Sequence, residues 1–197
     1  LKTNTTGVNN VASGFQSMNL NTTGSRNIAY GYSSLGSNTT GNCNTAIGCG
    51  SLGGNTTASN NTAVGFDSLK ANTTGTQNTA TGYKALCKNT TADFNTAYGS
   101  AALRENQTGT LNVAIGHAAL RVTTSDNNTG IGSCALYNNT TGACNVAMGI
   151  DSLKTNTTAS FNTAVGIRSM CLNTIGCQNT ALGNDSLQAN TEGNLNT

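Results

Sequence analysis

Apolar and polar positions along this chain recur in a fixed pattern with a period of 17 residues. The unit reads Asn-Thr-Thr-Gly-x-x-Asn-Thr-Ala-x-Gly-x-x-Ser-Leu-x-x, and a clear copy spans residues 38–54. A fixed period of this length is typical of a solenoid, in which each unit packs only on its neighbours. Eleven copies begin at Asn4, Asn21, Asn38, Asn55, Asn72, Asn89, Asn106, Thr123, Asn139, Asn156 and Asn173, and a twelfth begins at Asn190.

Within each unit, positions seven to eleven carry the signal of a strand. They read Asn-Thr-Ala-x-Gly, as in residues 61–65. β-branched residues favour strands, and the pattern shows no helical 3.6-residue period. The turn signals Asn-Thr-Thr-Gly and x-Gly recur in every unit. We therefore predict an all-β fold, a parallel β-solenoid or β-roll of about eleven 17-residue coils, with two or three very short strands per coil.

Two residue types are constant where their neighbours vary. Position eleven is Gly in all eleven full copies, which predicts a positive φ or a close backbone approach. Position seven is always Asn, and position one usually is. Stacking places equivalent residues about 4.8 Å apart, so we predict an amide ladder at each of these positions. The ladder predicted at position seven comprises Asn10, Asn27, Asn44, Asn61, Asn78, Asn95, Asn112, Asn128, Asn145, Asn162 and Asn179.

The apolar positions predict a thin core and a second apolar stripe. Leu or Met at position fifteen and Ala at position nine bury little area per coil. Position ten is apolar or aromatic in nine of eleven copies and faces away from position nine. The pattern leaves open which of the two faces is interior. In either case it favours side-by-side association, most simply a homotrimer, with a subunit-interface stripe of Tyr30, Ile47, Val64, Tyr98, Ile115, Ile131, Met148, Val165 and Leu182.

The whole of residues 1–197 forms one repeat array, with partial units at 1–3 and 190–197. Because both ends fall inside a unit, we expect a segment of a longer array. The unit spanning 123–138 is one residue short and lacks the leading Asn. Counting its residues in order assigns Asp126 to position four. We predict a local kink or loosened coil there, with a specialised site as the alternative.

Composition narrows the possible partners. Asn and Thr supply 65 of the 197 residues and charged residues only 8%, yet the strict period favours order over disorder. The nine cations fall at several different repeat positions, so no basic stripe is predicted and no nucleic-acid partner is expected. No apolar run approaches the ~20 residues of a membrane span.

Candidate catalytic chemistry is sparse. The only histidine, His117, has no partner that the sequence can place, and Asp67, Asp151 and Asp185 share position thirteen in distant copies. No acid/base pair, phosphate loop or recurrent calcium-binding Asp is present. The seven cysteines never occupy one position in consecutive copies, which favours small semi-buried thiols, with one or two disulfides as the alternative. We predict no enzyme, and no catalytic, metal or cofactor residues.

The phrases Asn44–Gly48 (Asn-Thr-Ala-Ile-Gly) and Ser34–Gly41 carry a resemblance to a known repeat. They resemble the Asn-Thr-Ala-x-Gly repeats that precede intramolecular-chaperone domains in phage and virus tail fibres. More distantly, they are similar to the head repeats of trimeric autotransporter adhesins. The resemblance covers essentially the whole chain and implies an extracellular, trimeric β-roll fibre on a virion or cell surface, used for attachment. Seven cysteines are uncommon in secreted bacterial adhesins, which favours a viral or cytosol-assembled fibre.

Two other functions stay open at this stage: ice binding, and a role as subunit of an extracellular filament or matrix. Ice binding calls for Thr residues two apart on one face, whereas Thr5 and Thr6 and their equivalents are adjacent. The expected partner is the chain itself, and a surface glycan or receptor is a second candidate.

Overall fold

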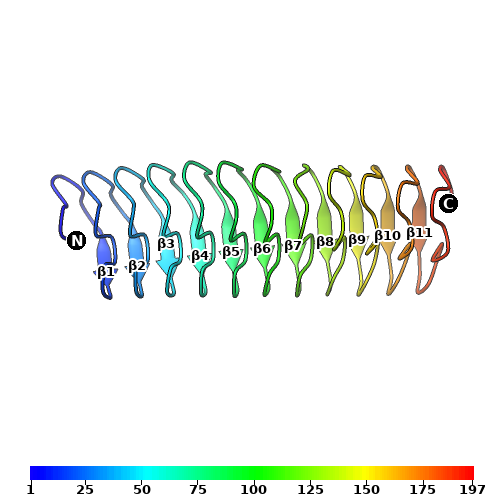
Figure 1. Cartoon of the computed structure of the whole chain (residues 1–197), viewed down its shortest axis with the longest axis horizontal. Helices are drawn as coiled ribbons and strands as arrows, with labels where there is room; N and C mark the ends of the chain where they lie inside the picture. The colour runs from blue at the N-terminus through cyan, green and yellow to red at the C-terminus, as the bar shows by residue number, and fades with distance from the viewer.

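The computed structural model describes residues 1–197 as a rod of stacked coils, with the two termini at opposite ends (Figure 1). Each coil corresponds to one 17-residue repeat. Eleven strands of three residues form one parallel sheet along the rod, and there is no helix. The predicted all-β parallel solenoid is therefore confirmed. The strands are β1 (Val11–Ser13), β2 (Ile28–Tyr30), β3 (Thr45–Ile47), β4 (Thr62–Val64), β5 (Thr79–Thr81), β6 (Thr96–Tyr98), β7 (Val113–Ile115), β8 (Thr129–Ile131), β9 (Val146–Met148), β10 (Thr163–Val165) and β11 (Thr180–Leu182).

Every strand pairs with the strand of the next repeat in exact positional register. Ala46 at the centre of β3, for example, is paired with Ala29 of β2 and Ala63 of β4. The one short repeat does not disturb this register, because Ala114 of β7 still pairs with Gly130 of β8. Equivalent side chains therefore lie in straight ranks along the rod.

Each coil contains one strand, so the prediction of two or three strands per coil was wrong. Positions six, thirteen and fifteen have positive φ in every coil, for example Gln16 at 57° and Met18 at 44°. A left-handed residue interrupts an extended strand because it turns the backbone away from the pleat. Coils are still joined there by single backbone hydrogen bonds, such as Met18 N–H to the carbonyl of Ser34 at 3.0 Å.

The interior of the rod is a narrow apolar column. Leu or Met at position fifteen and Ala at position nine form its main part, and Leu52 and Ala46 are completely buried. Ser or Ala at position fourteen completes the packing, as at Ser51. Position nine therefore faces inward. Since alternate residues of a strand face opposite sides, positions eight and ten face outward.

The constant glycine at position eleven meets both of the predicted demands. Gly65 has φ +132°, and a Cβ built on it would lie 2.6 Å from the carbonyl oxygen of Gly82 in the next coil. An L-residue is strained at that φ, and the stacked backbone leaves no room for a side chain. The prediction for this position is confirmed.

The short repeat lacks a residue at position three, and this corrects the sequence assignment of Asp126 to position four. The carbonyl of Ser125 accepts the side-chain amide of Asn112, as position-four carbonyls do in other coils. Oδ1 of Asp126 accepts the backbone N–H of Thr110 at 2.7 Å, the bond made by position-five side chains elsewhere. The missing residue shortens only the loop, and the strand that follows it keeps its register.

Candidate functional surface: the outward face of the sheet

The outward face of the eleven-stranded sheet consists of two parallel ranks of side chains. At a strand spacing of about 4.8 Å the face is about 48 Å long. The rank at position ten holds the predicted interface stripe. Six of its nine members are exposed, with Tyr98 60% and Leu182 79% accessible, and Val64, Ile131 and Val165 are half-buried.

The rank at position eight adds β-branched residues to the same face. Seven are threonines, and the other four are Val11, Ile28, Val113 and Val146. Neither rank contains a charged side chain. The face therefore presents methyl groups, a few aromatic rings and hydroxyl groups in a regular array. The threonines are Thr45, Thr62, Thr79, Thr96, Thr129, Thr163 and Thr180.

Two ranks of buried asparagines hold the coils at this spacing. At position one, the side-chain amides away from the short repeat donate to Oδ1 of the preceding copy, as Asn38 does to Asn21 at 2.8 Å. The same amide donates to the position-four carbonyl of its own coil, as from Asn38 to Gly41 at 3.0 Å. Buried amide groups are stable only when they are hydrogen bonded. This rank therefore fixes both the stacking and the loop within each coil.

The asparagines predicted as a ladder at position seven bond mainly to the backbone. Oδ1 of Asn44 accepts the backbone N–H of Asn61 at 3.0 Å, and its amide donates to the carbonyl of Ala58 at 2.8 Å. Direct side-chain bonds occur only in some coils, such as Asn44 to Asn27 at 3.1 Å. The rank thus links neighbouring coils through the residue that precedes each strand.

The position-one rank changes beside the short repeat. Oδ1 of Asn89 has no hydrogen-bond partner, because Oδ1 of Asn106 is engaged by the N–H of Gly109 and its amide bonds only within its own coil. Thr123 replaces the next asparagine and accepts the amide of Asn139 at 3.2 Å. These coils retain their strand pairing, so the defect is confined to the loop edge of the rod, which is formed by positions one to six of each repeat.

The side of the rod formed by positions thirteen, sixteen and seventeen carries most of the charges. The sequence distributes them over several repeat positions, but the turn brings those positions together on one face. The signs are mixed, because five cations pair with four carboxylates on this face. The pairs are Lys70–Asp67, Lys88–Glu105, Arg104–Glu105, Lys154–Asp151 and Arg168–Asp185.

Two of these ion pairs shift the pKa of a member. A hydrogen bond from Lys88 lowers the pKa of Glu105, because it stabilises the carboxylate. A hydrogen bond to Asp151 raises the pKa of Lys154, because it stabilises the ammonium. Arg121 has no carboxylate partner and instead lies over the ring of Tyr137.

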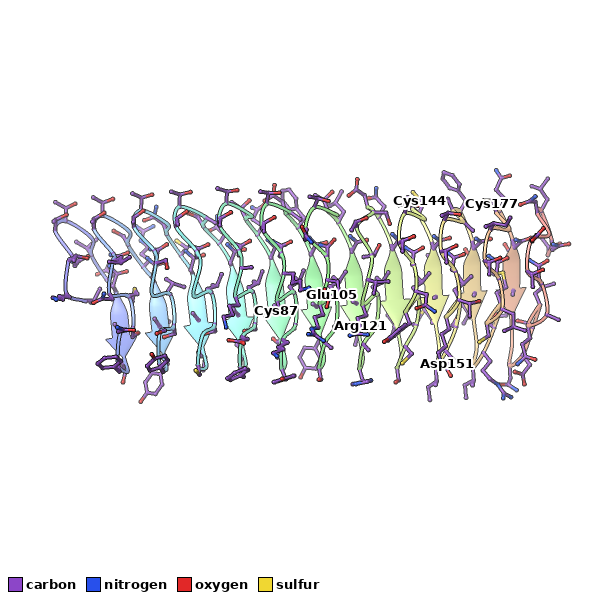
Figure 2. All side chains as sticks on the ribbon, viewed as in Figure 1. Cys87, Glu105, Arg121, Cys144, Asp151 and Cys177 are labelled. Atoms are coloured by element: carbon purple, nitrogen blue, oxygen red, sulfur yellow. The ribbon has the colours of Figure 1, made fainter.

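The cysteines lie at positions five, six, twelve, thirteen and sixteen of their repeats, and all seven are free thiols. Figure 2 shows Cys144 and Cys177 at the loop edge of the rod, with Asp151 near the opposite edge. Burial raises the pKa of the thiols of Cys87 and Cys171. The alternative of one or two disulfides is not realised.

No group of three or more His, Cys, Asp or Glu side chains is arranged to hold a metal ion. His117 lies at exposed position twelve, and Asp67, Asp151 and Asp185 are separated along the charged face, each paired with a cation. No helix that could cross a membrane is present.

The rod has one hollow, on the charged face, with a volume of about 760 Å³. Tyr32, Cys49 and Phe66 are among the residues that line it. Sequence reasoning missed this site. Its signal was the copy spanning 38–54, where positions twelve, thirteen, sixteen and seventeen are Cys, Gly, Gly and Gly.

Three comparisons with known proteins complete the description of the surface. No protein-family model matches the chain, and neither a curated protein nor a solved structure matches it. Function must therefore be argued from the surface itself.

Proposed function

We propose that this chain is part of the shaft of an extracellular fibre or adhesin, on a virion or cell surface, that contributes to attachment. The observation that supports this proposal is the uncharged outward face of the sheet. Nine of the eleven side chains at position ten are apolar or aromatic, and soluble monomers seldom expose so large a set of apolar side chains in one strip. An interface with other copies of the chain would remove it from water.

Three copies arranged about an axis parallel to the rod make the simplest assembly. Each chain has one such face, so a closed threefold arrangement buries all three faces against each other. The charged faces then point to solvent, which suits their ion pairs. The interface would extend along the rod, because equivalent residues lie in straight ranks on every coil. A long, stiff, laterally joined rod is suited to holding a binding site away from a surface.

The mass of the purified chain in solution tests this assembly. We expect light scattering or sedimentation to give about three times the 19.9 kDa chain mass. Ile47→Asp and Ile115→Asp place a charge in the interface and should shift the mass to that of one chain. Leu111→Asp is the matched control, because Leu111 is 54% exposed at position six, away from this face.

The measured masses of the wild-type chain and its variants decide whether the assembly forms. A folded wild-type chain with the mass of a monomer would overturn the assembly, and so would an Ile115→Asp variant that keeps the wild-type mass. Attachment itself is tested by adding the intact wild-type fibre to candidate host cells or surfaces and measuring retention. Loss of retention with an assembly-deficient variant is the expected result.

Ice binding is a second candidate because positions eight and ten share the outward face. The adjacent threonines at positions two and three are not the relevant ones. Position eight supplies a rank of threonines about 4.8 Å apart, beside a rank of mostly apolar side chains about 7 Å away. Thermal hysteresis of the wild-type chain tests it directly. The two functions compete for one face, since a trimer would cover the ranks that ice requires.

A further inference from the structure

In the first five coils, from Phe15 to Tyr83, position twelve carries an aromatic column with one interruption. Phe15 stacks on Tyr32 with ring centroids 5.7 Å apart, and Phe66 stacks on Tyr83 at 5.6 Å. Cys49 occupies the coil between these two pairs. Tyr32 and Phe66 therefore face each other across a single coil that has no ring.

The same coil has almost no side chains on the adjoining charged face. Gly50, Gly53 and Gly54 occupy positions thirteen, sixteen and seventeen, where the next coil carries Asp67 and Lys70. The result is the hollow of about 760 Å³, which is within the range of small-molecule sites. It is lined by Gly50, Gly53 and Gly54 and by side chains of the neighbouring coils, and the carboxylate of Asp67 lies against Gly50, because an added Cβ there would clash with Oδ1.

The separation of Tyr32 and Phe66 matches one ring. Tyr32 and Phe66 lie two coils apart, which is about 10 Å along the rod. A ring midway between them would be about 5 Å from each, within the ~4.5 to 7 Å centroid range of stacked rings. A ligand ring can therefore take the place in the column that Cys49 leaves open.

The polar groups of the hollow favour an uncharged ligand rich in hydroxyl groups. The side chain of Asp67 is 10% exposed and pairs with Lys70 at 3.1 Å. The carboxylate can accept from a hydroxyl group and the ammonium can donate to one. Because the pair is close to neutral, it does not select a cation, although two facing aromatic rings alone would attract one. Ser33 and Gln16 add further hydroxyl and amide groups.

We propose that this hollow binds one pyranose ring of a glycan, stacked between Tyr32 and Phe66 and hydrogen bonded to Asp67 and Lys70. The C–H groups of a pyranose face carry a small positive charge that suits the negative faces of aromatic rings. The assignment of this site to attachment rests on the proposed function. The binding site itself does not depend on trimer formation, because all of its residues lie in one chain and away from the strand face.

Saturation-transfer NMR and titration calorimetry on the full chain test this site. The probes are the methyl glycosides of glucose, galactose, mannose, fucose, N-acetylglucosamine and N-acetylgalactosamine, with indole as a flat aromatic comparator. At least one glycoside should bind at millimolar concentration, with transfer to the C–H protons of its ring. Binding of none of the glycosides, or of indole alone, would overturn the proposal.

Two variants locate the binding. Cys49→Phe fills the gap with a side chain that other coils already carry at position twelve, so the variant should fold. Its affinity for the glycoside should be reduced roughly tenfold or more. Phe66→Ala removes one wall and should weaken binding similarly. Phe161→Ala is the matched control, because Phe161 is 61% exposed at position six on the other edge. Unchanged affinity in Cys49→Phe would refute the site.

Mass measurements on the same samples keep the two proposals apart. Glycoside binding by a chain that stays monomeric would retain the site and reject the trimeric shaft. A trimer that binds no glycoside would reject the site and retain the shaft.

Discussion

The side-chain amide of Asn38 donates to Oδ1 of Asn21 at 2.8 Å, and both residues are completely buried. The two residues hold the same position in adjacent coils. Oδ1 of Asn38 in turn accepts the amide of Asn55 at 2.9 Å, so each asparagine is donor and acceptor at once. This relationship makes the position-one rank a polar support of the stack that runs from coil to coil.

We expect Asn38→Ala to destabilise the chain by about 2 to 6 kcal/mol. The change leaves Oδ1 of Asn21 buried without a donor and removes an acceptor from Asn55, and each such loss costs about 1 to 3 kcal/mol. Urea unfolding followed by circular dichroism measures the effect. Asn138→Ala is the control, since that exposed side chain makes no hydrogen bond, and it should change stability by less than about 0.5 kcal/mol. Equal effects of the two variants would contradict the role of the rank.

Gly65→Ala should destabilise the chain by at least about 2 kcal/mol. The added methyl group meets the carbonyl oxygen of Gly82 at 2.6 Å, and the φ of +132° is strained for any L-residue. Thermal unfolding gives the comparison with Gly36→Ala. Gly36 has no positive φ, and other coils carry larger side chains at this position, such as Lys70 and Arg104, so this variant should be close to neutral. A tolerated Gly65→Ala would show that the backbone columns separate more easily than the structure indicates.

Ala101→Gly should stabilise the chain by about 0.5 to 1 kcal/mol. Ala101 has φ 58°, and relief of a left-handed residue is worth about 1 to 2 kcal/mol, partly offset by the greater entropy of glycine in the unfolded chain. Gly50 already occupies this position in another coil. The neighbouring Ala102→Gly provides the comparison. Ala102 is buried and has no positive φ, so this substitution should destabilise the chain by about 1 kcal/mol. The two variants should thus shift the urea midpoint in opposite directions.

Acid should weaken the chain partly through Glu105. Its pKa is lowered in the fold by the hydrogen bond from Lys88, so its contribution to stability is present above the ordinary glutamate pKa. That contribution is lost as the pH falls through the lowered pKa of the folded state. We expect Glu105→Gln to lose less stability than wild type between about pH 5 and about pH 3, measured as the urea midpoint. Parallel pH profiles for the two proteins would argue against this ion pair.

Alkylation by iodoacetamide should distinguish the cysteines. Only the thiolate reacts, and burial raises the pKa of Cys87 and Cys171. Both should therefore be modified more slowly than the exposed Cys43 and Cys144 near pH 8. Peptide mass spectrometry over a time course gives the order. In urea all four thiols should react at equal rates, which provides the reference. Equal rates in the folded chain as well would contradict the burial of Cys87 and Cys171.

Much of the fold was predictable because the chain is periodic. Identical residues at a fixed spacing must become neighbours once the coils stack, so constancy at a position reports a contact with itself. The solenoid and the requirement for glycine at position eleven follow from this constancy. The number of strands per coil does not, since no sequence period marks the left-handed residues at positions thirteen and fifteen. Leu52 at φ 48° has no local signal for that conformation.

The sequence by itself determined the repeat, the parallel stacking and the residues that would lie in ranks. Only the tertiary structure decided that Ala46 faces inward and Ile47 outward, because a period of two assigns two faces without saying which is interior. It also decided that Tyr32, Cys49 and Phe66 border one hollow with the glycines of the intervening coil. Positions twelve to seventeen are brought together by a turn whose path depends on left-handed residues, and an alternating pattern carries no information about that path.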